Sequence, residues 1–335
     1  MTQKILFVGQ HKNPESAERL IIRELKNKCE VKAFDYINSY KLLGKDLQVV
    51  PLLGNLLVKK INHNLSKLAE KYAPDILFVA KGQLILPETI EYIKEELSPK
   101  TIFWMPDDPQ LFEKISHKVA YVYDYVLTSS DQCVPMYKDL GVKKVEYMPF
   151  FCDPLVHKQI YLDKFQKEKY GADISFVGTY YPERGNLVNK IRNFHIKIWG
   201  PGWKRYFKSK NGKIKIMSDW ANQKTMVKIF NSSKIVLNIH HVQMKFGGMK
   251  ANSRVFEATG CKAFHLTDIP LGLEDLFECD KEIACYHDDT ELIELLKYYL
   301  DSEEERNVIA EKGQKRTYRD HTVSNRVKRI LEMIT

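Results

Sequence analysis

Short apolar runs rich in β-branched residues alternate along the whole chain with longer segments of helical period. The first series of runs is KILFVGQ, EVKAFDY, DILFVAKG, TIFWMP, DYVLTSS and KVEYMPF, and the second is DISFVGTYY, FHIKIWGPGW, KIKIMSD, KIVLNIHH, CKAFHLTD and KEIACYHD. Such alternation is typical of βαβ units, in which helices join parallel strands. The pattern therefore predicts an α/β protein with two series of parallel strands.

The length of the chain favours two domains. At 335 residues it exceeds the ~250–300 residues at which a single hydrophobic core usually stops growing. We predict two Rossmann-like, doubly wound domains that face each other across a cleft, with ligands at the carboxyl ends of the strands. Their expected bounds are residues 1–165 and 166–318, and residues 319–335 are expected to form a C-terminal helix with an apolar face to cover.

Helices are expected between the strands. The periodic segments run from about Pro14 to Lys28, from Leu56 to Tyr72 and from Pro87 to Leu97, and further ones begin near Arg184, Asn222, Ser253, Thr290 and Ser302. In the last segment the apolar residues Val323, Val327, Ile330, Leu331 and Ile334 recur at helical spacing.

The cysteines and the apolar runs indicate in which cellular compartment the protein is expected. Six cysteines are scattered without a C-x-x-C pair, which favours a reduced, intracellular protein. No apolar run approaches the ~20 residues needed to cross a bilayer. We expect a cytoplasmic protein without a transmembrane segment, and peripheral contact with the inner face of the membrane stays open.

Positive charge is concentrated in one stretch. The net charge is +9, but residues 184–250 contain fifteen Lys or Arg and one acidic residue, so they carry +14 and the rest of the chain −5. Such a run can be an ordinary solvated face. It can also bind phosphates, as a nucleotide diphosphate, an anionic lipid surface or a nucleic-acid backbone.

Two common phosphate-binding motifs are absent from the sequence. No strand is followed by G-x-G-x-x-G, which argues against an NAD-dependent dehydrogenase. There is also no Walker A loop, which argues against phosphoryl transfer of that kind.

The segment DISFVGTYYPERGNLVNKI is a candidate diphosphate site. It places Gly178 after a strand and Arg184 near the start of a helix. Glycine allows close backbone approach, a helix N-terminus favours anions, and a guanidinium can bind phosphate with two hydrogen bonds. The alternative is an ordinary turn with a solvated arginine.

The segment KFGGMKANSRVFEATGCKAF is the most specific in the chain. Gly247 and Gly248 precede a helix whose opening turns carry Asn252, Arg254 and Glu257. Arg254 and Glu257 are three residues apart and share a helical face, so a carboxylate can bind sugar hydroxyls while the arginine meets phosphate. The alternative is a surface ion pair. Trp203, in GPGW, could stack on a base or lie in the core.

Candidate polar site residues follow three strands of the first series. In FWMPDDP, Asp107 or Asp108 could bind or deprotonate a hydroxyl, and Asp107 is the better candidate because Asp108 can instead cap a helix beginning at Pro109. The loops with Gly9 and His11 and with Lys81 and Gly82 occupy equivalent strand ends. They are expected to line the same cleft, with structural turns as the alternative.

A metal site is not expected. His240 and His241 end a strand and could act with Asp268, but no third ligand stands at a suitable spacing. We therefore expect neither a metal nor another cofactor.

The combination of FVGTYYPERGNLV, IWGPGW, NIHH, NSRVFEATGCKAFHLTD, GLEDLFECDKEIACYHDDTELIELLKYYL and RTYRDHTVSNRVKRIL resembles the spore-maturation CgeB-like glycosyltransferases. FWMPDDP and the run SSDQCVPMYKDLGVKKVEYMPFFCDP resemble their N-terminal domain. The resemblance covers nearly the whole chain and implies a GT-B architecture, with an acceptor-side N-domain, a donor-side C-domain and a C-terminal helix (residues 319–335) that packs back on the N-domain. Retaining GT-B enzymes with two carboxylates eight residues apart would match Glu257 as the first, but the second position here is His265.

The resemblance implies a metal-independent glycosyltransferase that moves a sugar from a nucleotide-diphosphate sugar, such as a UDP-sugar, to a hydroxyl of a glycan, a lipid-linked or a polymeric acceptor. Asp107 and Glu257 are the expected catalytic residues, and Gly178, Arg184, Trp203, Gly248, Asn252, Arg254 and Glu257 the expected donor site. Three alternatives stay open: a protein that binds nucleic acid or an anionic surface, a catalytically silent scaffold, and a sugar-nucleotide epimerase.

Overall fold

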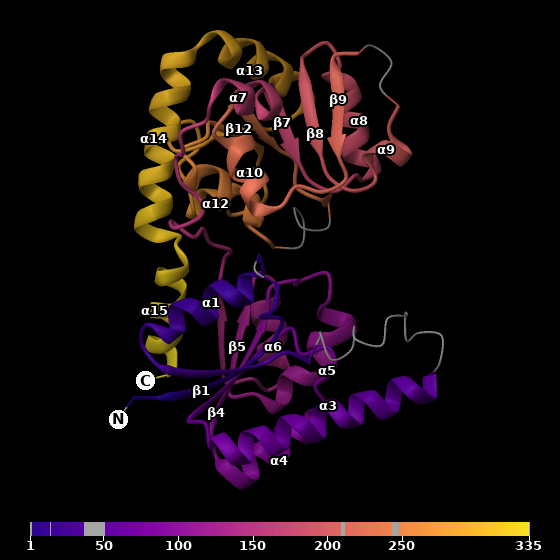
Figure 1. Cartoon of the computed structure of the whole chain (residues 1–335), viewed down its shortest axis with the longest axis vertical. Helices are drawn as coiled ribbons and strands as arrows, with labels where there is room; N and C mark the ends of the chain where they lie inside the picture. Colours follow the sequence, from indigo (N-terminus) through magenta and orange to yellow (C-terminus); the bar gives the residue numbers. More distant parts are fainter. Residues whose placement is uncertain (1, 14, 37–50, 209–211, 243–247, 335) are drawn as a thin grey trace. The chain divides into compact units, whose positions relative to one another are not determined.

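The computed structural model describes residues 2–13, 15–36, 51–208, 212–242 and 248–334 (Figure 1). Its contacts divide the chain into two units. Unit 1 comprises Met1–Pro149 with Arg326–Thr335, and unit 2 comprises Phe150–Asn325. The division thus falls at Pro149, whereas the sequence pattern places it at residue 165.

Unit 1 contains a parallel sheet of six strands in the order β2-β1-β3-β4-β5-β6. The strands are β1 (Lys4–Val8), β2 (Glu30–Phe34), β3 (Ile76–Ala80), β4 (Lys100–Met105), β5 (Tyr125–Thr128) and β6 (Lys144–Tyr147). The strand order reverses between β1 and β3, which pair in register from Ile5 with Ile76 to Val8 with Val79. In a doubly wound sheet a crevice forms outside the carboxyl ends of the two strands that flank such a switch point.

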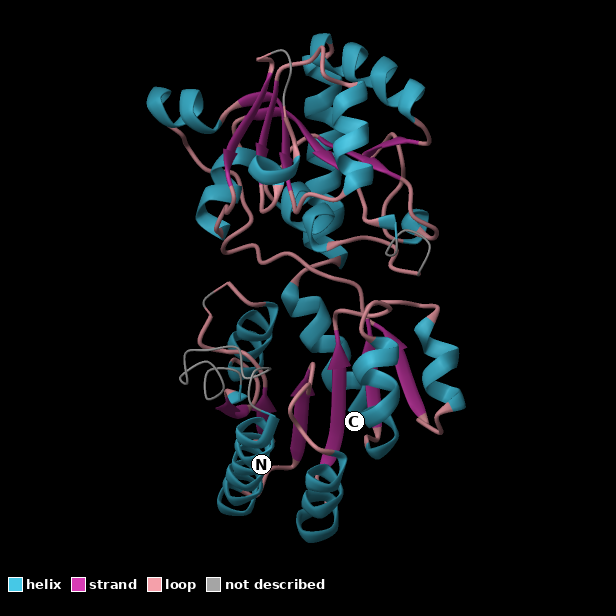
Figure 2. Ribbon diagram, turned by 90° about the vertical axis from the view of Figure 1, so that its right-hand side faces the viewer, coloured by secondary structure: helices cyan, strands magenta, loops and turns pink. Residues whose placement is uncertain are grey.

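Helices lie on both faces of this sheet (Figure 2). They are α1 (Ala17–Lys26), α3 (Pro51–Tyr72), α4 (Pro87–Leu97), α5 (His117–Val119) and α6 (Cys133–Asp139), with a π-helical turn over Phe112–Ser116. Ser16 caps α1 by accepting a hydrogen bond from the Arg19 amide, and Pro87 opens α4. The residues of β3 are all buried, as expected for a strand covered on both faces.

Unit 2 contains a second parallel sheet of six strands, in the order β12-β11-β10-β7-β8-β9. The strands are β7 (Ala172–Val177), β8 (Ile196–Trp199), β9 (Ile214–Ser218), β10 (Ser233–Asn238), β11 (His265–Asp268) and β12 (Ala284–Tyr286). Relative to its own first strand this is the 3-2-1-4-5-6 order of Rossmann domains, with the switch point between β7 and β10. The predicted α/β class and two doubly wound sheets are confirmed.

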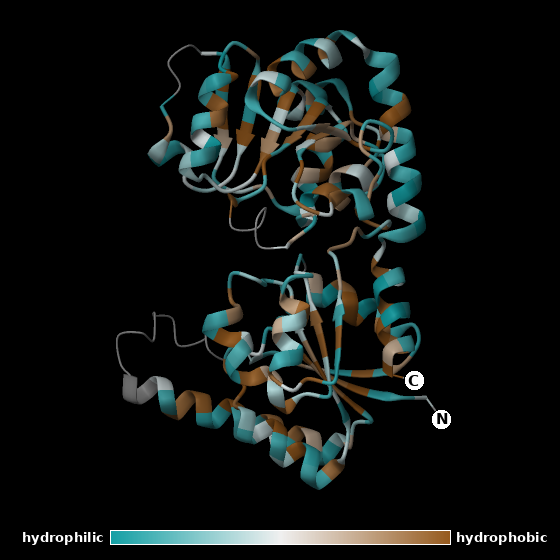
Figure 3. Cartoon of the chain, turned by 180° about the vertical axis from the view of Figure 1, so that it is seen from behind, coloured by the Kyte–Doolittle hydropathy of each residue, from teal (hydrophilic) through white to brown (hydrophobic). Residues whose placement is uncertain are grey.

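The helices of unit 2 are α7 (Lys164–Tyr170), α8 (Pro182–Lys190), α9 (Trp203–Tyr206), α10 (Gln223–Phe230), α12 (Ser253–Gly260), α13 (Asp289–Asp301) and α14 (Glu303–Asp320). Figure 3 shows the hydrophobic strands of both units beside helices with mixed faces. The last helix, α15 (Val323–Ile334), begins in unit 2, and its residues from Arg326 belong to unit 1. There Arg329 forms an ion pair with Glu146 at 2.9 Å.

Two of the cysteines correct the expectation of a fully reduced protein. Cys279 and Cys285 form a disulfide, whereas Cys29, Cys133, Cys152 and Cys261 are free and buried. The pair was not apparent from the sequence because its members are six residues apart and become neighbours only when the chain turns back after the first of them. Within the described residues, no helix is both long enough and apolar enough to cross a membrane.

Candidate functional site

Arg184 joins the two strand ends at the switch point of unit 2. Its guanidinium donates to the carbonyl of Ile239, after β10, from Nε at 3.0 Å and Nη2 at 2.6 Å, and to the carbonyl of Thr179, after β7, at 2.9 Å. The residue is 7% exposed and its guanidinium lies over the rings of Phe176 and Tyr181. Arg184 therefore lies where the sequence predicted a phosphate clamp, but three of its five donors already hold the backbone.

Gly178 packs against backbone and side chains instead of standing open to a ligand. Its amide donates to the carbonyl of Trp199, and its carbonyl accepts from Nε1 of Trp203, each at 2.9 Å. A Cβ on Gly200 would lie 1.9 Å from this same carbonyl. Trp203 is fully buried, with Phe176 and Phe207 around it, so it occupies the core position that was the alternative to stacking on a base.

A histidine and an aspartate connect the ends of β10 and β11 to the start of α12. His240 Nδ1 lies 2.7 Å from Oδ1 of Asp268, which also accepts from the His240 amide at 2.9 Å. His240 Nε2 accepts from the amide of Asn252 at 3.2 Å, so the proton of the ring belongs on Nδ1. Asn252 caps α12 and also donates to Asn238 at 3.1 Å. This network fixes the N-terminus of α12 beside the switch point.

Arg254 and Glu257 form the ion pair expected from their spacing, through Arg254 Nη1 and Glu257 Oε2. Their side chains are 21% and 13% exposed, so this is a half-buried pair and not a solvated one. Arg254 also contacts the sulfur of Met226. Burial lowers the pKa of neighbouring His157, against the opposing effect of the Glu257 carboxylate.

The turn before α12 is only partly described. Gly248 is buried and has a φ of 76°, a left-handed conformation that favours glycine. Gly247, predicted with it, lies outside the described residues. Lys250 follows and pairs with Asp275.

His265 lies at the amino end of β11 and is 1% exposed. Both of its ring nitrogens are buried without a hydrogen-bond partner among the described residues. Burial, with the charges of His240 and Arg254, lowers its pKa to about 3. This position therefore holds a neutral core histidine where the two-carboxylate pattern would have a second acid.

In unit 1, Lys81 and Asp107 meet at the ends of β3 and β4. Lys81 Nζ lies 2.8 Å from an oxygen of Asp107, and the side chains are 26% and 37% exposed. Burial would lower the pKa of Lys81, but the carboxylates of Asp107 and Glu18 raise it on balance. The sequence predicted both residues of this pair for the acceptor side.

Glu18 is a further acidic group at this place, which the sequence analysis missed. It stands in the first turn of α1, is 4% exposed, and lies beside Gly9, where an added Cβ would be 3.6 Å from Glu18 Cγ. Burial raises the pKa of Glu18, partly offset by Lys81. Glu18, Lys81 and Asp107 thus gather two carboxyl groups around one ammonium at the switch point of unit 1.

His11 and Asp108 have other roles. Asp35, after β2, accepts from the amides of His11 and Lys12 at 3.2 and 3.0 Å and lies 3.8 Å from the His11 ring. Asp108 is completely buried and accepts from the hydroxyls of Ser116, Thr128 and Tyr137 at 3.1, 2.6 and 2.7 Å. It neither faces solvent nor caps a helix at Pro109.

The described residues contain no group of three or more His, Cys, Asp or Glu arranged to hold a metal ion. The sequence pattern suggests His240 and Asp268 only as metal ligands, so their role as an anchor for α12 was not predicted. A signal was present, since NIHH and HLTD place polar side chains at the ends of two successive strands. Adjacent parallel strands bring such ends together.

Part of the chain matches a known protein family, and the chain is similar to a known spore protein. Residues 183–332 match the family model described as "Glycosyl transferase-like". Spore protein CgeB of Bacillus subtilis (strain 168) is 25% identical over 261 residues, covering 74% of this chain and 79% of that protein.

Solved structures show the fold. Anabaena Alr3699/HepE in complex with UDP and glucose superposes with a TM-score of 0.67 at 14% identity, covering 99% of both chains. Sucrose-phosphate synthase from Thermosynechococcus elongatus gives a TM-score of 0.70 at 10% identity, covering 99% of this chain and 98% of the other. The chain therefore has the two-domain α/β fold of GT-B glycosyltransferases, with a glycosyl transferase-like match over residues 183–332 and similarity to CgeB.

Proposed function

We propose that this protein transfers a sugar from a UDP-sugar to a hydroxyl group of its acceptor, and that the donor binds at the switch point of unit 2. The observation that carries the proposal is the anchoring of α12 by His240 and Asp268 beside the strand ends that Arg184 joins. The choice of uridine nucleotide is supported by the similar Anabaena structures, whose complexes contain UDP and UDP-glucose.

The proposed donor site uses the N-terminus of α12 and the pair Arg254–Glu257. A helix N-terminus carries about half a positive charge, which favours a diphosphate. Arg254 has donors beyond those used for Glu257 and Met226, and these can bind a phosphate oxygen. Glu257 is held by Arg254 and can accept hydrogen bonds from the hydroxyls of the sugar.

Arg184 and Gly178 act indirectly in this proposal. Arg184 holds the ends of β7 and β10 at a fixed separation through its three backbone contacts. Gly178 holds the loop after β7 through its hydrogen bonds with Trp199 and Trp203, and Gly200 allows this close packing because it has no Cβ. Both residues therefore position the site instead of contacting the donor.

On the acceptor side, we place the hydroxyl beside Asp107, with Lys81 orienting the carboxylate. The acceptor oxygen forms the new bond to the anomeric carbon, and the bond from that carbon to the diphosphate oxygen breaks. The proton of the hydroxyl passes to Asp107, and UDP leaves with the electron pair of the broken bond. The α12 N-terminus and Arg254 stabilise the developing charge on the diphosphate, so transfer needs no metal ion.

The test has two stages. A thermal-shift screen of the purified protein against UDP, GDP, TDP and CMP identifies the nucleotide, because a ligand of the folded state raises the melting temperature. We expect a shift with UDP that is unchanged by EDTA. Hydrolysis or transfer of the corresponding sugar is then measured for the wild type and for Glu257→Gln. A protein that binds none of these nucleotides would overturn the proposal.

A further inference from the structure

A lysine-rich cavity lies at the opposite end of the unit 2 sheet from the switch point. It is formed where β7, β8, β9 and β10 begin, and its volume is about 380 Å³. This size is within the range of small-molecule sites. The residues that line it are Lys167, Gly171, Ala172, Asp173, His195, Ile196, Lys197, Lys213, Lys215, Ser232 and Lys234. We call it the lysine cavity.

The lysine cavity has a strong excess of positive charge. Five lysines face a single acidic side chain, Asp173, which pairs with Lys234 at 2.8 Å. Lys197 donates to the carbonyl of Glu168 at 2.9 Å, and Lys213 to that of Asn193 at 3.0 Å, so neutral backbone oxygens orient two of the ammonium groups. Burial and the neighbouring charge of Lys215 lower the pKa of Lys197.

Three of the five lysines, Lys167, Lys197 and Lys215, have no acidic partner within the described part of the chain. Lys167 on α7 and Lys215 on β9 are also exposed. Several ammonium groups on separate elements, held near one another with one carboxylate between them, repel one another unless an anion is bound. The lysine cavity therefore favours a ligand with more than one negative charge.

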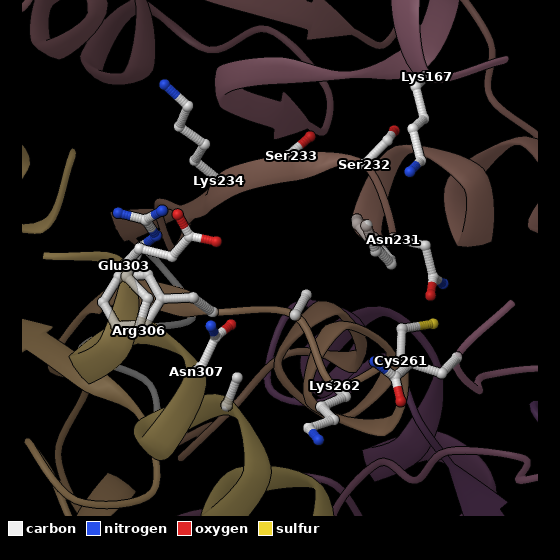
Figure 4. Close-up of a pocket in the computed structure, with 15 residues that line it drawn as sticks. Lys167, Asn231, Ser232, Ser233, Lys234, Cys261, Lys262, Glu303, Arg306 and Asn307 are labelled. Carbon is white, nitrogen blue, oxygen red and sulfur yellow. The ribbon is translucent and has the colours of Figure 1, made fainter. Parts of the chain in front are cut away.

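A second cavity adjoins the first and shares Lys167, Ser232 and Lys234 with it (Figure 4). Its volume is about 340 Å³. Arg306, which lines it, donates hydrogen bonds to the carbonyls of Tyr299 and Leu300 at the end of α13. Glu303 also lines this second cavity, so the excess of positive charge is greatest in the lysine cavity.

We propose that the lysine cavity binds a phosphate-bearing group, separately from the sugar donor. Ammonium groups bind phosphate oxygens through charge-assisted hydrogen bonds. The ligand is either a free phosphate compound or the headgroup of an anionic phospholipid. Two large aromatic side chains stand near Lys167 in the chain and face solvent, Phe165 at 70% and Tyr161 at 91% exposure. Exposed aromatics beside lysines are the usual composition of a lipid-facing surface.

The experiment compares the wild type with Lys167→Gln/Lys215→Gln, which removes the two exposed lysines of the cavity that form no ion pair within the described residues. The matched control is Lys26→Gln/Lys28→Gln, which removes the same charge from exposed lysines at the end of α1 in unit 1. Titration with inorganic pyrophosphate tests a free phosphate compound. Cosedimentation with vesicles of phosphatidylcholine and phosphatidylglycerol, against vesicles of phosphatidylcholine alone, tests a lipid headgroup.

We expect the wild type and the control to bind one of these probes, and the cavity variant to bind it on the order of tenfold more weakly. Binding of pyrophosphate identifies a free phosphate compound as the source, and selective binding of the phosphatidylglycerol vesicles identifies a headgroup. The thermal shift with UDP should be the same in all three proteins, which separates this proposal from that of the donor site. A wild type that binds neither probe, or equal weakening in both variants, would overturn the proposal.

Discussion

His240 and Asp268 meet at the carboxyl ends of neighbouring strands, with 2.7 Å between Nδ1 and Oδ1, and Nε2 of His240 accepts from the amide of Asn252, the N-cap residue of α12. Both residues are buried. Because the two strands are adjacent in the sheet, this pair holds the helix that carries Arg254 and Glu257 in a fixed position.

Replacing His240 with alanine should destabilise the protein and weaken its affinity for UDP together. The substitution leaves the Asn252 amide and the Asp268 carboxylate without this partner, at a cost of about 1–3 kcal/mol. Asp268→Asn keeps an acceptor oxygen for His240 and should cost less. Urea unfolding and UDP titration measure the two effects. An alanine variant with unaltered stability and affinity would contradict the role of the pair.

Glu257→Gln should lower turnover far more than donor affinity. The amide keeps the size of the side chain but loses the charge that meets Arg254, so we expect a fall in kcat on the order of 10²-fold. Steady-state kinetics with the donor that the screen identifies measure this change. Glu311→Gln, which removes the exposed partner of Lys315 on α14, is the control and should leave kcat unchanged. Equal losses in both variants would refute a direct role for Glu257.

Arg184→Lys should lower the free energy of unfolding while leaving kcat nearly unchanged. Lysine cannot donate simultaneously to the carbonyls of Thr179 and Ile239 in the geometry of a guanidinium, so we expect a loss of about 1–2 kcal/mol. At a temperature where the variant is folded, its kcat should stay within a few-fold of the wild type. A loss of UDP binding without a loss of stability would instead restore the phosphate-clamp hypothesis.

Asp107→Asn and Lys81→Met should impair transfer without affecting UDP binding, because both residues belong to unit 1. If they act as one pair, the double variant should lose no more activity than the Asp107→Asn variant, and a double-mutant cycle measures this coupling. Additive losses would indicate separate roles. Glu18→Gln tests whether the buried third member supports the same pair.

Asp108 should make the folded state less stable as the pH rises from about 4 to about 6. Burial raises its pKa to about 6 from 3.8, even though three hydroxyl groups donate to it. The folded protein thus binds more protons than the unfolded chain in this interval, and the favourable contribution is lost as the pH rises through the folded pKa. The total change is on the order of 3 kcal/mol.

Asp108→Asn should flatten this part of the curve, since an amide stays neutral at every pH. Urea unfolding of the wild type and the variant between pH 4 and pH 7 measures the difference. Parallel curves for the two proteins would show that Asp108 does not titrate in this range.

The strands and the residues at their ends could be predicted because their signal is local. Lys81 and Asp107 follow apolar runs, and parallel strands bring such positions together whatever the helices between them do. Glu18 was missed because an acidic residue in the first turn of a helix is usually a surface residue. Its burial depends on packing against Gly9, which no pattern within the helix reveals.

The role of Arg184 could not be predicted for a related reason. Its main acceptor, the Ile239 carbonyl, lies 55 residues further along the chain, and only the pairing of β7 with β10 brings it within reach. The hydroxyl groups around Asp108 likewise come from positions 8, 20 and 29 residues away. Spacing in the sequence carries no information on contacts of this kind.

Because the strand orders of the two sheets differ, the crevice of unit 1 should open by local unfolding more readily than the crevice of unit 2. In unit 1 the reversal lies at β1, which has only β2 beyond it among the described strands, whereas in unit 2 three strands lie on each side of the reversal. Edge strands open first in local unfolding. The amides of His11 and Lys12, which donate to Asp35 after β2, should therefore exchange with deuterium sooner than those of His240 and Asn252. The loop that contains His11 and Lys12 is thus expected to lose its arrangement on warming before the residues around His240 do.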